Sequence, residues 1–500
     1  MQLSKLLQNI TKEKIPSDVA HYDIRNVCSD SRKVIPNSLF IALKGFSQNG
    51  EDFIPDAVKK GAVAVIKSPS GSQSKSLTSR LPKDPNVFIL EVEDTNKTLR
   101  EIAAKFYDHP SSKVRTIGVT GTNGKTTTTF VIESILQKAG QACGVLGTIN
   151  YRINREVFPA PNTTPDVIGI QQFLYNLMQK NIPYCVMEVS SHGLDQGRVD
   201  LIDFKVGLFT NLTSDHLDYH QTTEKYFLAK AKLFQNLSKG SHAIINGDDP
   251  LAKQLKAMTK AKVYTFGVSS DSDFKAVDIT TDISHTSFQI KCPQGKMINI
   301  RSKLIGLHNI YNILGAVAAC YAEKIPISSI EKGVEELAMV PGRLEKINCG
   351  QDFHVFIDYA HTEDGLKNVL SCLQDIKTRK LIVVFGCGGN RDKTKRPKMG
   401  KVASQLAEIV ILTSDNPRTE DPQDIIDEII VGCSKENYAV SAERKEAIYY
   451  ALHLAQKDDV VLIAGKGHED YQIFKNQTIH FNDKEVIQEF FAARKLVNKA

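Results

Sequence analysis

The sequence feature that most constrains the fold is a strand-like run that leads directly into a glycine-rich loop. Residues 114–119 have the composition of a buried strand, and residues 129–139 have that of a helix. The loop between them contains Thr120-Gly121-Thr122-Asn123-Gly124-Lys125-Thr126-Thr127. This order predicts a phosphate-binding turn, because glycines let backbone N–H groups approach a polyphosphate while Lys125 adds charge and Thr126 offers a hydroxyl to Mg²⁺.

The loop departs from the strict pattern G-x-x-x-x-G-K-[ST] at its first position, where this chain has Val119. A glycine-rich turn that binds no nucleotide is therefore the alternative interpretation. The order of strand, Gly-Lys-Thr and helix favours nucleotide binding over that alternative.

Length and charge limit the classes of protein to which this chain can belong. Its 500 residues, of which 41% are hydrophobic and 24% charged, suffice for several packed cores and about three domains. The formal charge of +6 is spread along the sequence without a dense basic block. This distribution favours an anionic small molecule as partner and predicts no nucleic-acid partner.

Cysteine usage and hydropathy predict a location. The nine cysteines are widely spaced and form no C-x-x-C pair, which is typical of free thiols in a reducing cytosol. No run of about 18 apolar residues occurs, and the N-terminus lacks a continuous apolar segment. We therefore expect a cytoplasmic protein without a membrane partner.

The first two of the three predicted domains span residues 1–112 and 113–341. In the first, short apolar runs alternate with helical stretches. In the second, buried-strand candidates alternate with helices, which predicts a largely parallel sheet covered on both faces, whereas residues 271–305 have a more antiparallel pattern. The central strand candidates are residues 184–189, 206–210 and 243–246.

The third predicted domain spans residues 342–500 and has the pattern of a second open α/β sheet. Its strand candidates, each followed by a polar, charged or glycine-rich loop, are residues 354–357, 380–385, 409–412 and 460–464. Ligands of open sheets bind beyond the carboxyl ends of the strands. We expect Asp358, Arg391, Asp415 and Lys466 to face one crevice there.

Two polar segments of the central domain are candidates for metal binding. Glu188 ends a predicted strand and can hold Mg²⁺ against a bound nucleotide, although a solvated strand-end glutamate is the alternative. His216 lies in the polar loop 210–220 and could bind a second metal ion or simply form a hydrogen bond. Composition alone does not assign a role to Lys230.

Four motifs occur in an order and spacing that resembles the Mur ligases. They are Gly121-Thr122-Asn123-Gly124-Lys125-Thr126-Thr127, Met187-Glu188-Val189-Ser190-Ser191-His192, Leu304-Ile305-Gly306-Leu307-His308-Asn309 and Asp358-Tyr359-Ala360-His361. The resemblance implies a smaller N-terminal α/β domain, a central P-loop-type ATPase domain with a mostly parallel sheet, and a C-terminal Rossmann-like open sheet. It also implies ATP-dependent amide formation in peptidoglycan precursor synthesis, and thus roles in cell-wall biogenesis, cell shape, cell division and the cell cycle.

The resemblance assigns residues to ATP, to Mg²⁺ and to catalysis. The implied ATP-binding residues are Gly121, Thr122, Asn123, Gly124, Lys125, Thr126, Thr127, Asn309, Arg343 and Asp358. The implied catalytic residues are Lys125, Glu188, His216 and Lys230. Lys230 matches the family's carbamylated lysine, and its carbamate would hold Mg²⁺ together with Thr126, Glu188 and His216.

Within the family, Asn162-Thr163-Thr164-Pro165 and the segment 190–198 resemble the ligase that adds the third peptide residue to UDP-N-acetylmuramoyl-L-alanyl-D-glutamate. The residues implied to bind this nucleotide-sugar peptide are Ser29, Ser31, Phe46, Ser47, Gln48, Thr163, Thr164, Ser190, Gln196 and Arg198. The N-terminal matches are short, and a surface turn is their alternative. The domain 1–112 would bind the UDP-sugar and the domain 342–500 the amino acid.

The segment Asp415-Asn416-Pro417-Arg418 resembles the subgroup that adds meso-2,6-diaminopimelate. The arginine fork suits the distal carboxylate of that amino acid, which L-lysine lacks. The implied pocket consists of Arg391, Asp415, Asn416, Pro417, Arg418, Gly465 and Glu469, with Glu469 facing the distal ammonium. Two alternatives stay open: L-lysine as the substrate, and an Arg418 that only pairs with Glu420.

One departure from the family pattern occurs in D-Y-A-H-T-P, where this chain has Glu363 in place of the proline. It raises a question about the turn and about ATP affinity. The proton acceptor for the attacking amine is also open, with His216 and His361 as candidates.

Two other protein classes compete with a ligase. A nucleic-acid motor would also use Gly-Lys-Thr, but the chain has neither a basic stripe interleaved with aromatics nor a strand that ends in Asp-Glu after the loop. An idle binding protein is disfavoured because Lys125, Glu188 and Lys230 are all present. We expect a monomeric enzyme that acts on small molecules.

Overall fold

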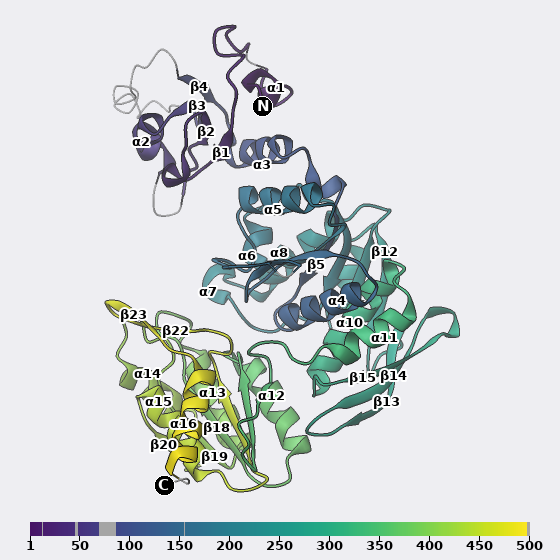
Figure 1. The fold of residues 1–500 in the computed structure, drawn as a ribbon, viewed down its shortest axis with the longest axis vertical. Coiled ribbons are helices and arrows are strands. Elements are labelled where there is room, and N and C mark those ends of the chain that lie inside the picture. Colours follow the sequence, from purple (N-terminus) through teal and green to yellow (C-terminus); the bar gives the residue numbers. More distant parts are fainter. Residues whose placement is uncertain (13, 46–48, 70–86, 155, 498–500) are drawn as a thin grey trace. The chain divides into compact units, whose positions relative to one another are not determined.

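The computed structural model describes residues 1–12, 14–45, 49–69, 87–154 and 156–497 (Figure 1). The chain packs into two units, the first made of Met1–Thr116, Pro161–Cys185 and His192–Phe204, and the second of Ile117–Ala160, Val186–Ser191 and Lys205–Ala500. Over the described residues the sheets have four, eleven, six and two strands. The domain boundaries after residues 112 and 341 stay a prediction.

The first unit contains the small α/β sheet expected near the N-terminus. Its strands pair in parallel in chain order: β1 (Asn26–Cys28), β2 (Ser38–Ile41), β3 (Ala62–Lys67) and β4 (Phe88–Glu91). Its helices include α1 (Leu3–Leu7), α2 (Ile54–Lys59), α3 (Thr95–Phe106) and α5 (Val167–Gln179). An apolar core between α1, α3 and the sheet includes Leu6, Leu39 and Ile102.

The eleven-stranded sheet has a parallel part and an antiparallel extension. Its order is β15-β14-β13-β12-β11-β10-β5-β9-β6-β7-β8. The strands are β5 (Arg115–Thr120), β6 (Cys143–Leu146), β7 (Tyr151–Ile153), β8 (Glu156–Phe158), β9 (Tyr184–Glu188), β10 (Phe204–Phe209), β11 (His242–Asn246), β12 (Lys262–Gly267), β13 (Phe274–Thr281), β14 (Thr286–Lys291) and β15 (Met297–Ser302). Strands β10 to β13 pair in parallel, and β13 to β15 are antiparallel, as the pattern of residues 271–305 predicts.

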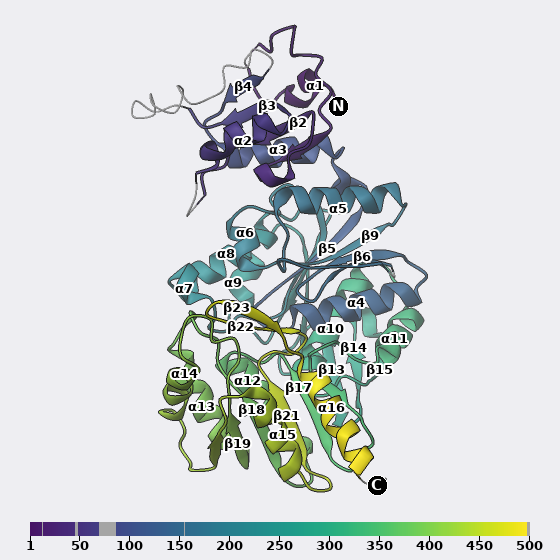
Figure 2. The ribbon, with the colours of Figure 1, turned by 60° about the vertical axis from the view of Figure 1, so that its left-hand side comes forward.

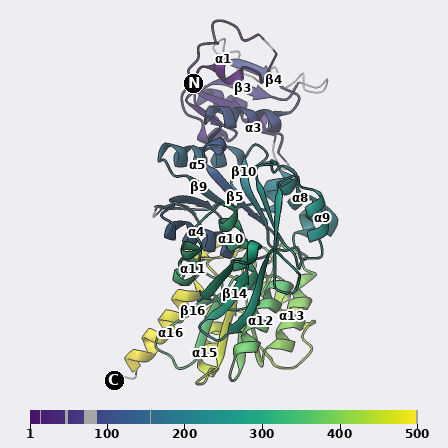
Figure 3. The same ribbon diagram turned by 90° about the vertical axis from the view of Figure 1, so that its right-hand side faces the viewer.

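Helices α4, α10 and α11 pack together against this sheet (Figure 3). The helices of this part of the chain are α4 (Lys125–Lys138), α6 (Ser191–Asp195), α7 (Leu217–His220), α8 (Thr223–Gln235), α9 (Ala252–Ala257), α10 (Leu307–Ala322) and α11 (Ile327–Glu336). The helix after the glycine-rich loop thus begins at Lys125, earlier than the predicted segment 129–139. Gly124, with a φ of 85°, supplies the left-handed turn that starts it.

The C-terminal part of the second unit forms the expected second open sheet (Figure 2). In the order β16-β17-β21-β18-β19-β20, only the first pair is antiparallel. The strands are β16 (Glu345–Ile347), β17 (His354–Asp358), β18 (Leu381–Phe385), β19 (Ile409–Leu412), β20 (Tyr438–Val440) and β21 (Val460–Ala464), with a separate hairpin of β22 (Tyr471–Phe474) and β23 (Gln477–His480). The helices are α12 (Glu363–Ile376), α13 (Lys395–Leu406), α14 (Pro422–Ile430), α15 (Arg444–Leu454) and α16 (Asp483–Val497).

Strand β18 shows how this sheet separates two cores. Leu381, Val383 and Phe385 pack into the core under α12, α13 and α14, whereas Ile382 and Val384 pack into the core under α15 and α16. Successive side chains of a strand point to opposite faces, so a continuous apolar run fills both cores. This arrangement brings the loops after β17, β18, β19 and β21 to one edge of the sheet.

Membrane spanning is not supported by any described helix. Within the described ranges, each helix is too short or too polar to cross a bilayer.

Candidate active site

The phosphate loop joins β5 to α4 in the predicted geometry. The Lys125 ammonium donates to the carbonyl oxygens of Gly121 and Thr122 at 2.9 Å each. Burial lowers the pKa of Lys125. A side chain at Gly124 would collide with the amide oxygen of Asn312 on α10, which is why the loop needs glycine there.

Glu188, at the end of β9, lies against the start of α4. Its carboxylate accepts hydrogen bonds from the Thr126 hydroxyl at 3.0 Å and from the Thr148 N–H and hydroxyl at 2.9 Å each. The Glu188 side chain is 1% exposed. A buried carboxylate beside two hydroxyls is a set of hard oxygen donors, which fits Mg²⁺.

Lys230 is buried on α8 beside the same loop. Its ammonium donates to Gly121 O at 2.8 Å and lies 4.4 Å from the centre of the Tyr226 ring. Burial, reinforced by the charge of Lys125, lowers the pKa of Lys230 well below its ordinary value. A neutral buried amine is the form that can react with carbon dioxide, so the environment fits the predicted carbamate.

His216 occupies a more open position than the other predicted catalytic residues. It has a left-handed backbone with φ of 53°, its side chain is 46% exposed, and Nε2 lies 3.5 Å from the Asp215 carboxylate. Among the described residues, no three His, Cys, Asp or Glu side chains are grouped so as to hold a metal ion. The metal role of His216 therefore stays a prediction.

Three predicted ATP residues lie around the phosphate loop and the start of the C-terminal sheet. Arg343 donates to the Thr126 hydroxyl at 3.2 Å and stacks on the Tyr359 ring at 4.5 Å. Asn309 donates to Ile305 O at 2.9 Å. Asp358 accepts from the N–H groups of Leu344 and Ala360, and burial raises its pKa.

The remaining phosphate-loop residues are tied to distant segments. The Thr122 hydroxyl donates to Thr213 O at 3.2 Å, and Thr127 is buried. The Asn123 amide donates at 2.8 Å to Asp364 in the first turn of α12. The loop is therefore braced by segments that follow it by about ninety to more than two hundred residues in sequence.

The predicted nucleotide-sugar residues are placed in different parts of the chain. In the first unit, Arg198 donates to Thr164 O at 2.7 Å and to the Gln196 side chain at 3.0 Å, so these three residues come together. Ser31 begins a short 3₁₀ turn capped by Asp30. Three further predicted residues, Ser29, Thr163 and Ser190, are half-buried. Phe46, Ser47 and Gln48 lie outside the described residues.

Arg418 lies in the loop after β19 with a left-handed φ of 55°. It donates to Gly389 O at 2.8 Å, in the loop that carries Arg391. Burial and the charge of Arg391 lower the pKa of Arg418. Glu420 instead pairs with Arg396 at 2.9 Å and Lys393 at 3.1 Å, so a pairing of Glu420 with Arg418 is not what the structure shows.

The other predicted amino-acid residues border Arg418. The Asn416 amide donates to Glu469 Oε2 at 2.9 Å. Gly465 has φ of 112°, and a side chain there would meet the Asp415 carboxylate. Asp415, Asn416 and Pro417 are buried, and Glu469 is half-buried. The loops after β18, β19 and β21 thus meet as predicted from the parallel sheet.

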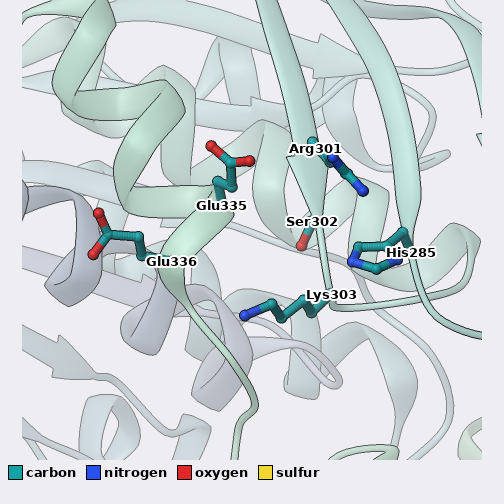
Figure 4. Close-up of a pocket in the computed structure, with 6 residues that line it drawn as sticks. All are labelled: His285, Arg301, Ser302, Lys303, Glu335 and Glu336. Carbon is teal, nitrogen blue, oxygen red and sulfur yellow. The ribbon is translucent and has the colours of Figure 1, made fainter.

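Two cavities lie near β15 in the second unit. One of about 290 Å³ contains none of the predicted residues and is lined by His285, Arg301, Ser302, Lys303, Glu335 and Glu336 (Figure 4). The other, of about 130 Å³, has a wall formed by Arg343 together with the apolar side chains of Leu304, Met339 and Phe356.

Three family models cover most of the chain. Residues 23–107 match the Mur ligase family catalytic domain, residues 119–320 the Mur ligase middle domain, and residues 342–467 the Mur ligase glutamate ligase domain. This chain belongs to the Mur ligase family. The expected ligase class and α/β architecture are thereby confirmed.

Similar Mur ligases extend over almost the whole chain. A protein of Clostridium acetobutylicum named UDP-N-acetylmuramoyl-L-alanyl-D-glutamate–2,6-diaminopimelate ligase 1 is 42% identical over 493 residues, or 98% of this chain and 99% of its own. A ligase of Oceanobacillus iheyensis with the corresponding name is 42% identical over 97% of this chain and 98% of its own.

Solved structures share the fold of this Mur ligase. A UDP-N-acetylmuramoyl-L-alanyl-D-glutamate–2,6-diaminopimelate ligase superposes with a TM-score of 0.69 at 32% identity, covering 99% of this chain and 100% of that one. MurF ligase from Thermotoga maritima in complex with ADP has a TM-score of 0.64 at 19% identity, covering 95% of this chain and 99% of that one. At that identity the second likeness concerns the fold alone.

Sequence reasoning missed several residues of this Mur ligase site. Asn312 donates to the Asn309 side chain at 3.1 Å and borders the phosphate loop. Its position three residues after Asn309, on the same helical face, was an available signal. Thr148 and Asp364 gave no such signal, since their contacts with Glu188 and Asn123 depend on the fold.

Proposed function

We propose that this chain joins meso-2,6-diaminopimelate to the D-glutamyl γ-carboxylate of UDP-N-acetylmuramoyl-L-alanyl-D-glutamate, with hydrolysis of ATP to ADP and phosphate. The observation that carries the choice of amino acid is the placement of Arg418 near Arg391 and Glu469. The guanidinium groups of Arg391 and Arg418 suit the distal carboxylate of diaminopimelate, and the Glu469 carboxylate suits its distal ammonium.

The first chemical step makes the substrate carboxylate reactive. The γ-carboxylate oxygen attacks the γ-phosphorus of ATP, the bond to the bridging oxygen breaks, and an acyl phosphate and ADP result. Lys125, beside the loop carbonyls, is positioned to turn toward the phosphates and screen their charge. Positioning and charge stabilisation account for most of the catalysis in such transfers.

Glu188, Thr126 and Thr148 would hold Mg²⁺ at the head of α4. The ion would neutralise phosphate charge when bound. Arg343, which reaches Thr126, and Asp358 and Asn309 would hold the nucleotide from the other side of the loop.

Lys230 is proposed to act as a carbamate with His216 at a second Mg²⁺ site. The lowered pKa of Lys230 supports this role, because the neutral amine is the nucleophile toward carbon dioxide. The ammonium form would place a second positive charge beside Lys125. The carbamate removes that repulsion.

The second step forms the amide bond. The neutral amine of diaminopimelate attacks the acyl carbon, phosphate leaves, and the amine loses a proton. His361 Nδ1 contacts Tyr359 O at 2.8 Å, so Nδ1 carries the hydrogen and Nε2 is the nitrogen able to accept one. His361 and His216 remain the two proposed acceptors.

We infer that the reaction takes place in the cytoplasm, because its proposed substrates are ATP and a UDP-linked precursor. We infer that the nucleotide-sugar peptide is held by Ser29, Ser31, Thr163, Thr164, Ser190, Gln196 and Arg198, and that the chain acts as a monomer on small molecules. Carbamylation, Mg²⁺ dependence and the cell-cycle role belong to the same proposal.

The test is phosphate release by the purified protein with ATP, Mg²⁺, bicarbonate and UDP-N-acetylmuramoyl-L-alanyl-D-glutamate. Meso-diaminopimelate and L-lysine are offered in separate reactions. We expect release with diaminopimelate only. Preference for L-lysine would contradict the assignment of Arg418. If the folded protein released no phosphate with either amino acid, the ligase reaction would be contradicted.

A further inference from the structure

Lys466 is a fully buried lysine beside the residues proposed to bind the amino acid, and no step of the proposed reaction uses it. It follows β21 and is 0% exposed. Its ammonium lies 3.2 Å from Glu469 Oε2 and 3.3 Å from the side-chain oxygen of Asn416. A buried charge persists only where its partners compensate for lost hydration, so these contacts hold Lys466 in place.

Lys466, Asn416 and Glu469 form a closed network. The Asn416 amide donates to the same Glu469 oxygen at 2.9 Å, and its carbonyl oxygen also accepts the Ile473 N–H at 3.0 Å. The other carboxylate oxygen of Glu469 accepts, within the part of the chain that the structure describes, one hydrogen bond, a long one of 3.5 Å from the Tyr359 hydroxyl. One oxygen of Glu469 is thus committed to the protein, and the other is the one a ligand could reach.

The network links the two loops that carry the pocket. Asn416 belongs to the loop after β19, which contains Arg418, and Glu469 to the loop after β21. The charged side chains of these loops include Arg391, Arg418, Lys466, Asp415 and Glu469, and the buried ion pair of Arg444 with Asp483 lies beside them. Lys466 is the cation in contact with Glu469.

We propose that Lys466 is a positioning residue that sets the choice of amino acid by holding Glu469 and partly neutralising it. The inference rests on the proposed function. A distal ammonium alone, as in L-lysine, meets a Glu469 already paired with Lys466 and has no carboxylate for the arginines. A distal ammonium with a neighbouring carboxylate satisfies Glu469 and the arginines together.

The test compares kcat/KM for meso-diaminopimelate and L-lysine in Lys466→Met and Lys466→Arg. Methionine keeps the length of the buried chain without the charge, and arginine keeps the charge. In Lys466→Met we expect the ratio of kcat/KM for diaminopimelate over L-lysine to fall about tenfold or more, mainly through KM. Lys466→Arg should recover most of that ratio.

A purely structural role gives a different result. It would lower kcat and the melting temperature of Lys466→Met while leaving the ratio within about twofold of the unmodified protein, which would overturn the inference. Lys445→Met, which removes a lysine near the surface of the same domain, is the matched control. It should change neither the ratio of kcat/KM nor the melting temperature.

The double variant Lys466→Met/Glu469→Gln tests whether Lys466 acts through Glu469. Removing both charges avoids leaving either one buried and unpaired, so this variant keeps the test available if Lys466→Met does not fold. We expect its KM for diaminopimelate to equal that of Glu469→Gln. If the two substitutions changed the KM for diaminopimelate independently of each other, the inference would be overturned. An unmodified protein silent with both amino acids would overturn the proposed function itself.

Discussion

Lys125 and Lys230 donate to the same backbone oxygen, that of Gly121, at 2.9 and 2.8 Å. One comes from the start of α4 and the other from the middle of α8, so two lysine side chains converge on the phosphate loop. Like charges at such a separation repel, and the repulsion is relieved by an anion or by loss of a proton. A bound polyphosphate would be such an anion, and the lowered pKa of Lys230 favours loss of its proton.

Lys230→Met should raise stability and strongly lower activity. Burial and the charge of Lys125 lower the pKa of Lys230 in the folded protein well below the value of about 10.4 that it has in the unfolded chain, so a protonated Lys230 opposes folding. Removing the lysine removes that cost, and we expect a melting temperature about 2–4 °C higher at pH 7. Ligase activity should fall about 100-fold or more because a charge-stabilising group is lost.

The gain from Lys230→Met should shrink as pH rises toward 10, where the unfolded chain also loses the proton. Thermal melts at pH 7 and 9 measure this. Lys225→Met, on the exposed side of α8, is the control and should change stability by less than about 0.5 kcal/mol. An equal gain at both pH values would contradict the role of the buried charge.

Arg418→Lys should impair the use of diaminopimelate without affecting ATP. Lysine has the same backbone cost at φ of 55° but loses the fork that binds a carboxylate. We expect kcat/KM for diaminopimelate to fall about 10–100-fold, since hydrogen bonds to charged groups contribute about 1.5–3 kcal/mol. Steady-state kinetics measure both constants, and Arg379→Lys, at an exposed arginine of the same domain, is the control. A comparable rise in the KM of Arg418→Lys for ATP would argue against the assignment of Arg418 to diaminopimelate.

Glu363→Pro, which restores the proline of the family pattern, should change neither the turn nor the affinity for ATP. Glu363 is exposed and is the first residue of α12, a position that suits either an acidic residue or proline. Thr362, the residue before it, has φ of −122° and ψ of 160°, which a following proline permits. We expect a melting temperature within about 2 °C of the unmodified protein and a KM for ATP within about twofold. A large loss of stability would show that the Glu363 side chain has a structural role.

His308, at the start of α10, should make the protein less stable in mild acid. Burial lowers the pKa of His308 to about 4, against 6.5 in the unfolded chain. The unfolded chain therefore binds more protons between these values, and stability is greatest above about pH 6.5 and falls as pH drops toward 4. The contribution is about 1–3 kcal/mol. Urea unfolding from pH 7 to 5 should be less pH-dependent in His308→Gln, whereas His21→Gln, at an exposed site, should match the unmodified protein.

The strands of both large sheets were predictable because each is encoded locally. Within the predicted strand 380–385, residues 381–385 form a continuous apolar run, and β18 occupies those positions with alternate side chains in two cores. The phosphate loop was predictable for a similar reason, since strand, glycines and Lys125 are contiguous. The loops that carry Arg391, Asp415 and Lys466 could be placed together because parallel strands end at one edge, whereas the family resemblance placed Arg418 beside Glu469.

Contacts between distant segments were not predictable from residue patterns. Asn123 meets Asp364 across 241 positions, and each residue alone has the composition of an ordinary polar turn. Lys466 was expected only to face a crevice, while its burial against Glu469 and Asn416 depends on how the loops after β19 and β21 fold over it. The pKa of Lys230 likewise depends on burial and on Lys125, neither of which composition reveals.

The sequence by itself determined the α/β class, the phosphate loop, the family and the residue types available for catalysis, because these depend on contiguous patterns of hydrophobicity, glycine and charge. The tertiary structure decided which of those residues are buried, paired or exposed. Burial and pairing arise from long-range packing, and they set the charge state of Lys230, the commitment of one Glu469 oxygen to Lys466 and the exposure of His216.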